Sequence, residues 1–210
     1  MKTPRARLAA LCAAAGLLAG CSLLPEQQTV EIYRLPSALK APAASSADAQ
    51  EWSLRIDTPH ASPVLEATRI AVLASGDQVS SYAGARWAAP PPALVRARLA
   101  QAFRADGRAA SVSTDESNIR TDLELDSDLR AFQSEYRNGA PHAVLVLDAR
   151  LVAASTRRVV ASRSFEVARP AEGVQVQQVV SAFGAASDEL AAQVVQWVMD
   201  LHPARAYARR

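Results

Sequence analysis

The chain has 210 residues, half of them hydrophobic, which is enough for one globular domain with a sizeable core and short for two. It carries 23 Lys and Arg against 21 Asp and Glu, a formal net charge of +2, so no strong basic excess points to nucleic acid. We therefore expect a single domain and no nucleic-acid partner.

The start of the chain has the pattern of an export signal. Three basic residues come first, at Lys2, Arg5 and Arg7. The uncharged run that follows covers residues 8–19, well short of the roughly 20 apolar residues of a membrane-spanning helix. The run ends at Gly20 and Cys21, so a cleaved signal is expected rather than a retained helix.

Leu18-Ala19-Gly20-Cys21 resembles the lipobox of bacterial lipoproteins, where a peptidase cuts before a cysteine that already carries diacylglycerol. This predicts a signal peptide over residues 1–20, lipidation of Cys21 and a lipidated tether over residues 21–29. An ordinary secretory signal with a chance cysteine is the alternative. Cys12 leaves with the signal, so the mature chain has no free thiol for a disulfide or a thiolate metal site. Removing three of the 23 basic residues leaves 20 against 21 acidic ones, a mature charge of about −1.

The first part of the mature chain has four stretches with the alternating pattern of strands, at residues 29–35, 52–57, 69–74 and 78–83. Residues 36–50 are rich in Ala, Ser and Pro, and we expect a long surface loop there. In the second strand Trp52, Leu54 and Ile56 share one face. Ser-Gly-Asp at 75–77 separates the last two strands, which predicts a hairpin.

A switch from sheet to helix is predicted at the prolines of residues 90–92. Prolines lack the N–H that a strand ladder needs, but the last of them suits the first turn of a helix. The helix after them should end near Gly107. Its apolar side carries Leu94, Val95, Leu99, Ala102 and Phe103. Trp87 is expected to pack beneath the helix start, and a partner contact through Arg86 and Trp87 is the alternative.

After a weak strand at residues 109–113, a longer strand is predicted over residues 121–136. One face carries Leu123, Leu125, Leu129 and Ala131. Phe132 and Tyr136 fall in the opposite phase, which predicts a bulge near Ala131. The other face carries Asp122, Glu124, Asp126 and Asp128. Side chains two residues apart stand about 6.6 Å from each other along a strand and do not converge on one ion, so we favour a solvated face over a metal site.

Two more strands follow. Residues 143–153 start apolar on both phases, as in a strand covered on both sides, and residues 158–168 place Val159, Phe165 and Val167 on one face. With short connections, the three consecutive strands are expected to form an antiparallel meander.

The final helix has the clearest periodicity in the chain. Its apolar stripe comprises Val176, Val179, Val180, Phe183, Leu190, Ala191, Val194, Trp197, Val198 and Leu201. So wide a stripe predicts a helix that covers a sheet, with a coiled-coil seam as the weaker alternative. Pro203 should end the helix, and residues 204–210 form a basic tail.

Sequence motifs for catalysis are missing. G-x-S-x-G, H-E-x-x-H, the phosphate-binding G-x-x-x-x-G-K and the dinucleotide fingerprint do not occur. His60, His142 and His202 are scattered, and each neighbours a proline, which is typical of loops and turns. We therefore expect no catalytic residue, no cofactor, no metal and no enzymatic activity.

Several motifs together resemble the ABC-type transport auxiliary lipoproteins, the family that includes the paraquat-inducible C lipoprotein. The most specific are R-W-x-x-P-P at residues 86–91 and L-x-x-F at residues 129–132. The others are YRL after the lipobox, TPHASPVLEATRIAVL, LELDSDLRAF, and F-x-V-x-R-P before a long helix ending in QW. The resemblance runs from Val30 to Trp197, and the chain departs from it mainly in its longer alanine-rich loop.

The resemblance implies a small α/β (α+β) domain over residues 30–203, with a mainly antiparallel sheet packed by two helices. It also implies a place in a lipid-transport system with an ABC ATPase, a permease and an MCE-domain protein, and supplies no catalytic residue. Two functions stay open: a docking subunit held by Cys21 at the periplasmic face of the outer membrane, or a periplasmic lipid-binding carrier lipoprotein. A homo-oligomer is left open.

Overall fold

The computed structural model describes residues 29–39, 51–76 and 78–201. Cys21 and the tether before Thr29, most of the predicted alanine-rich loop, Pro203 and the basic tail lie outside the described residues. The predictions made for those parts of the chain therefore stay predictions.

The described residues form one nine-stranded mixed sheet and two helices. In chain order these are β1 Glu31–Tyr33, β2 Ser53–Ile56, β3 His60–Ala61, β4 Arg69–Ser75, β5 Gln78–Trp87, α2 Pro91–Asp106, β6 Ser111–Thr114, β7 Leu123–Arg137, β8 Ala140–Ala153, β9 Arg158–Pro170 and α3 Val176–Asp200. The longest ladders are antiparallel, so the prediction of a single α+β domain with a mainly antiparallel sheet and two helices is confirmed. Neither of these helices has the length and apolar character needed to span a bilayer.

Strand β7 lies at the centre of the sheet. One of its edges pairs with antiparallel β8, which pairs in turn with β9 as the predicted meander. Its other edge pairs in succession with β2, β3 and β4, all parallel to it. β4 and β5 form the predicted hairpin, and β1 and β6 add short parallel strands to β5 and β2.

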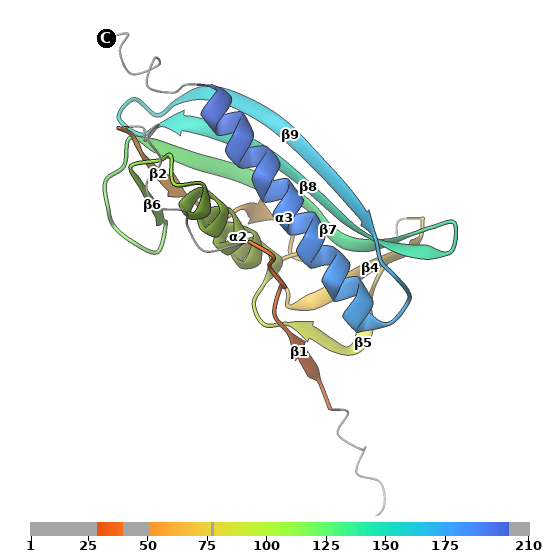
Figure 1. Ribbon diagram of the computed structural model, residues 1–210. Helices are drawn as coiled ribbons and strands as arrows, with labels where there is room; N and C mark the ends of the chain where they lie inside the picture. Colours follow the sequence, from red (N-terminus) through yellow and green to blue (C-terminus); the bar gives the residue numbers. More distant parts are fainter. Residues whose placement is uncertain (1–28, 40–50, 77, 202–210) are drawn as a thin grey trace, which may run out of the picture.

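Both helices lie on the same face of the sheet, with α3 running diagonally across the meander and α2 beside it (Figure 1). Helix α2 begins at Pro91, and Gly107, with φ of 72°, ends it by donating its N–H to the Phe103 carbonyl. At the start of α3, the side chains of Gln175 and Gln178 form a reciprocal capping box. The stripe predicted for α3 is buried against the sheet, as expected, apart from half-buried Val176 and Leu201 at its two ends.

Three aromatic side chains form the centre of the core. The Trp87 ring is only 2% exposed and stands edge-on to the rings of Phe132 and Phe183, with centroids 5.7 and 5.2 Å away. Phe132 reaches this side because the ladder shifts register between Leu129 and Ala131, the bulge that the sequence predicts. The predicted packing of Trp87 in the core is confirmed.

The face predicted for Val159 of β9 is wrong. Phe165 and Val167 are buried as expected, but Val159 is 56% exposed. The β8–β9 ladder shifts register there, since Leu151 faces Ala161 whereas Val152 faces Val159. The extra residue on β9 reverses the phase of the strand, which moves Val159 to the outer side.

Candidate functional site

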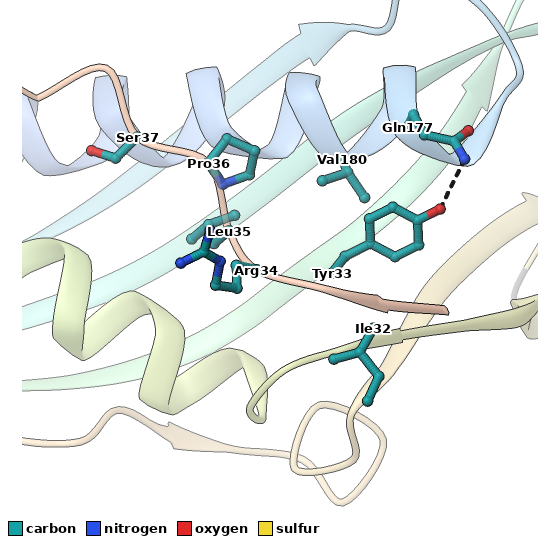
Figure 2. Close-up of a pocket in the computed structure, with 8 residues that line it drawn as sticks. All are labelled: Ile32, Tyr33, Arg34, Leu35, Pro36, Ser37, Gln177 and Val180. Carbon is teal, nitrogen blue, oxygen red and sulfur yellow. Dashed lines mark hydrogen bonds between the residues drawn. The ribbon is translucent and has the colours of Figure 1, made fainter. Parts of the chain in front are cut away.

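The chain that follows β1 lies between the two helices. We call residues 34–39 the N-terminal segment; it is the described part of the chain that continues from the predicted tether through β1. The backbone N–H of Ala38 donates a hydrogen bond to the Asp188 carboxylate of α3 at 2.8 Å. Pro36 packs so closely on Gly184 that a Cβ at this glycine would lie 3.0 Å from it. Glycine therefore lets the segment approach the helix backbone (Figure 2).

Arg98 of α2 holds this segment in place. Its guanidinium forms an ion pair with Asp188 and donates hydrogen bonds to the carbonyls of Leu35 and Pro36. Arg98 is 5% exposed. Burial lowers the pKa of its guanidinium, and the negative charge of Asp188 opposes this shift. We call Arg98 and Asp188 the clasp. A buried cation is tolerated when several acceptors surround it, so this one side chain ties α2, α3 and the N-terminal segment together.

Beside the clasp lies a surface groove of about 540 Å³. It is lined by Ile32, Tyr33, Arg34, Leu35, Pro36, Ser37, Gln177 and Val180. Gln177 of α3 donates a hydrogen bond to the Tyr33 hydroxyl at 2.9 Å, which crosses the groove (Figure 2). A hydrogen bond to Glu31 raises the pKa of this tyrosine. The walls combine apolar side chains with the polar groups of Arg34, Ser37 and Gln177, so the groove suits a peptide or a protein surface better than an acyl chain.

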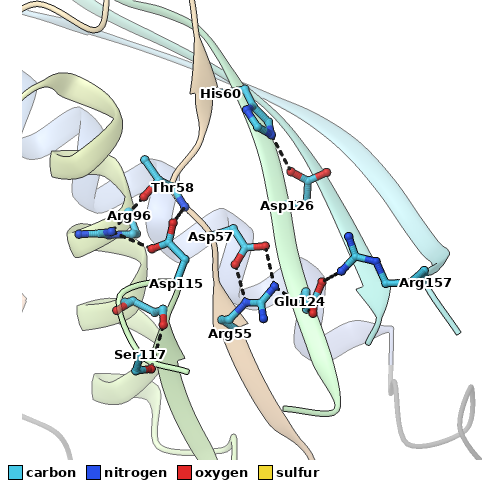
Figure 3. Close-up of polar contacts among 11 residues, drawn as sticks. Arg55, Asp57, Thr58, His60, Arg96, Asp115, Ser117, Glu124, Asp126 and Arg157 are labelled. Carbon is cyan, nitrogen blue, oxygen red and sulfur yellow. Dashed lines mark hydrogen bonds and ion pairs between the residues drawn. The ribbon is translucent and has the colours of Figure 1, made fainter. Parts of the chain in front are cut away.

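The open face of the sheet carries ion pairs instead of a solvated row of acids. Glu124 of β7 is 6% exposed and binds both Arg55, at 2.9 Å, and Arg157 (Figure 3). Asp126 and Asp128 both bind Arg150 of β8, at 2.9 and 2.6 Å. The prediction of a solvated face is therefore wrong for Glu124. The strand register explains why Glu124 is buried and paired, since Arg55 lies opposite it in the β2–β7 ladder.

A second ion-pair network joins α2 to the loop after β6. Arg96 binds Asp115, at 2.7 Å, and Glu116, and also donates to the Thr58 hydroxyl (Figure 3). Burial acts to raise the pKa of Asp115, but hydrogen bonds from Thr58 and Arg96 outweigh it, and the pKa is lowered. These contacts hold α2 over β2 and β6.

The structure does not bring the predicted partner-contact residues together on one surface. Trp87 is in the core, whereas Arg86 is exposed. His60 lies 3.8 Å from the Asp126 carboxylate, and the His142 ring lies 3.0 Å from the Ala140 carbonyl oxygen. Within residues 29–39, 51–76 and 78–201, no three His, Cys, Asp or Glu side chains gather as metal ligands would. Cys21 and His202 lie outside this part of the chain.

The sequence analysis does not predict the clasp. One signal for it is present, because Arg98 stands between Val95 and Leu99 on the apolar side of α2, where a cation needs a partner. Its partner, Asp188, is 90 positions away, and no local pattern links the two.

Comparison with known proteins identifies relatives over most of the chain. The family described as "ABC-type transport auxiliary lipoprotein component" matches residues 33–195. A crystal structure of a Xanthomonas campestris protein is 30% identical with a TM-score of 0.76, covering 85% of this chain and 99% of that one. A second crystal structure, of an uncharacterized protein, has a TM-score of 0.63 at 14% identity over 81% of this chain and 99% of that one, and shows the shared fold alone.

A longer relative is also found among curated proteins. An uncharacterized protein of Bradyrhizobium diazoefficiens is 31% identical over 189 residues, which is 88% of this chain and 50% of the relative. The chain thus spans about half the length of this curated relative.

Proposed function

The chain belongs to the ABC-type transport auxiliary lipoprotein component family, and from this membership we propose that it is a non-enzymatic docking subunit of an MCE-type ABC transport system. In this proposal Cys21 carries the lipid and fixes the chain to the periplasmic face of the outer membrane. The domain then receives the periplasmic end of an MCE conduit for lipids or organic solvents, whose ABC permease and ATPase lie in the inner membrane.

The clasp is the observation that best supports a docking role, because it fixes the chain after the anchor to both helices. The chain from Cys21 to Thr29 has eight residue steps, and at about 3.3–3.6 Å each it reaches no more than roughly 28 Å. From Glu31 onward the chain is built into the domain, by pairing with β5 and by the hydrogen bonds of Arg98. An anchor that enters a rigid domain over so short a reach suits a fixed docking subunit better than a diffusing carrier.

Binding rather than catalysis is proposed because the acidic side chains of β7 and of the loop after β6 are paired with arginines. The carboxylates of β7 bind arginines of neighbouring strands, and Asp115 binds Arg96. Such pairs stabilise a surface and leave no activated nucleophile beside a base. The family description is that of a transport component and agrees with this proposal.

A lipid-binding carrier is the second candidate. It would need an apolar cavity for acyl chains, whereas Trp87, Phe132 and Phe183 fill the centre of the core and the groove beside the clasp is lined partly by polar groups. This packing favours docking.

The proposed partner can be tested by co-purification. A tagged full chain is extracted from membranes in mild detergent, and its partners are identified by mass spectrometry. The expected partners are the MCE protein and the ABC permease, and recovery of neither would contradict the proposal. Cys21→Ser is the matched control, since serine cannot form the thioether and the variant should remain an unprocessed precursor.

The residue after the lipidated cysteine favours the outer membrane. It is Ser22, whereas enterobacterial-type signals for retention in the inner membrane carry Asp at this position. Fractionation of the protein with the inner membrane in a sucrose gradient would overturn that placement.

A further inference from the structure

Two exposed arginines stand opposite each other across β4 and β5. Arg69 and Arg86 are partners in this antiparallel ladder, so their side chains leave the same face with Cβ atoms about 5 Å apart. Within the part of the chain that the structure describes, neither forms an ion pair. Like charges in directly opposite positions destabilise a strand pair, which makes this arrangement costly unless an anion binds there.

Exposed apolar side chains surround these arginines. Ile32, 71% exposed, is the ladder partner of Arg86 in β1, and Figure 2 shows it pointing away from α3 while Tyr33 points toward Gln177. Val64 and Val79, 49% and 46% exposed, line a groove of about 420 Å³ together with Arg69. We call this surface the cationic patch; it comprises Ile32, Val64, Arg69, Val79 and Arg86.

The charge of the patch is positive. Two exposed acids are near the patch in sequence, Glu66 in the loop before β4 and Glu31 in β1. Glu31 accepts a hydrogen bond from the Tyr33 hydroxyl, which lies on the other side of β1. Three of the eight large apolar side chains exposed in the described residues belong to this one patch, namely Ile32, Val64 and Val79. Cations beside exposed apolar groups match the chemistry of an anionic bilayer interface.

We propose that the cationic patch lies on the membrane that holds the lipid of Cys21. Arg69 and Arg86 bind the phosphates of anionic phospholipids, and the apolar side chains enter the interfacial layer. The position of β1 supports this, because it is the first strand after the tether, and the ten residue steps from Cys21 to Glu31 reach no more than roughly 36 Å. The inference rests on the proposed lipid anchor and adds the orientation of the domain, with β1, β5 and β4 toward the bilayer and edge strand β9 away from it.

A depth probe tests this orientation. The mature chain has no other free thiol once Cys21 is acylated, so Ile32→Cys can be labelled selectively with a fluorophore. Val159→Cys, at an exposed position on edge strand β9, is the matched control. Each acylated full chain is placed in nanodiscs with brominated acyl chains, made of phosphatidylcholine alone or with added phosphatidylglycerol. We expect at least severalfold stronger quenching at position 32 than at 159 in discs with phosphatidylglycerol, and a loss of the difference at high salt.

Charge-reversal variants should show how much the two arginines contribute to membrane contact, apart from the apolar side chains. Arg69→Glu and Arg86→Glu should each lower the membrane-contacting population by about fivefold in discs with phosphatidylglycerol, as expected for one cation near an anionic surface. Arg158→Glu, an exposed site on β9, should leave the quenching at position 32 unchanged.

The outcomes distinguish this inference from the proposed function. Intact mass and flotation report the lipid on Cys21 independently of the probe. If the acyl mass is missing, both the anchor and the patch orientation are overturned. If the chain is acylated and floats but positions 32 and 159 are quenched equally, the orientation alone is overturned. If position 32 becomes shielded only when purified MCE protein is added, the patch binds protein, and the membrane assignment is also overturned.

Discussion

The two faces of the sheet use the same arginine–carboxylate chemistry in different surroundings. On the helix-covered face, Arg98 is 5% exposed and binds Asp188 together with two backbone carbonyls. On the open face, the Arg150 side chain is 33% exposed and binds Asp126 and Asp128 next to water. Water screens the Arg150 pairs and can replace either partner as a hydrogen-bonding group. The Arg98 side chain is largely shielded from water and depends on its protein partners. The buried pair therefore fixes the path of the chain, and the exposed pairs contribute little to stability.

The largest effect is expected on the helix-covered face, from Trp87→Ala. Removing this ring leaves a cavity beside Phe132 and Phe183, which should lower the free energy of unfolding by about 3–5 kcal/mol. That is a large part of the roughly 5–15 kcal/mol of a typical domain. Urea unfolding followed by circular dichroism measures it. A stable variant that no longer co-purifies with the MCE protein would instead assign Trp87 to an interface.

Arg98→Met tests the clasp itself. It should lower the free energy of unfolding by about 2–4 kcal/mol, less than for a fully buried pair because the Asp188 side chain keeps 18% exposure. Limited proteolysis should also become faster within residues 34–39, since their hydrogen bonds are lost. Arg150→Met on the open face is the matched control, with a loss of about 1 kcal/mol or less. Equal losses from the two substitutions would contradict the contrast between the faces.

A smaller effect is expected from acid, which should weaken the ion pair between Asp115 and Arg96. Its folded-state pKa lies below the ordinary 3.8, so the ionised carboxylate contributes stability above that value, and the contribution is lost as the pH falls through the folded pKa. We expect the melting temperature of the wild-type chain to fall below about pH 4 more steeply than that of Asp115→Asn. Thermal melts across this range measure the difference, and parallel curves would show that the pair with Arg96 is not linked to folding.

The smallest effects are expected at the histidines. His60→Ala and His142→Ala should change the free energy of unfolding by no more than about 0.5 kcal/mol, because both side chains have only weak surface contacts. Complementation of a deletion strain with a lipid-barrier defect should be normal, with protein levels measured for each variant. A folded, membrane-bound but inactive histidine variant would contradict the non-enzymatic proposal.

The fold could be predicted wherever burial repeats with a regular period. The α3 stripe and the alternation of Trp52, Leu54 and Ile56 carry such a period, and the change of phase at Phe132 revealed the β7 bulge. The β9 bulge could not be predicted, because Val159 is followed by another valine and the pattern shows no change of phase.

The polar contacts could not be predicted in the same way. Arg98 and Asp188 are far apart in sequence, and Glu124 meets Arg55 only because β2 pairs in parallel with β7. Their pairing depends on the sheet topology, which local patterns do not specify.

We propose that this family member docks a protein conduit and holds no lipid within its core. Native mass spectrometry tests this proposal on the acylated full chain with Arg69→Glu and Arg86→Glu, which removes the phosphate contacts proposed for the cationic patch, after release from membranes in mild detergent. We expect a mature chain that starts at the acylated cysteine, binds the MCE protein and retains no other lipid. A stoichiometric phospholipid bound to the domain in the absence of any MCE protein would contradict it and favour the carrier.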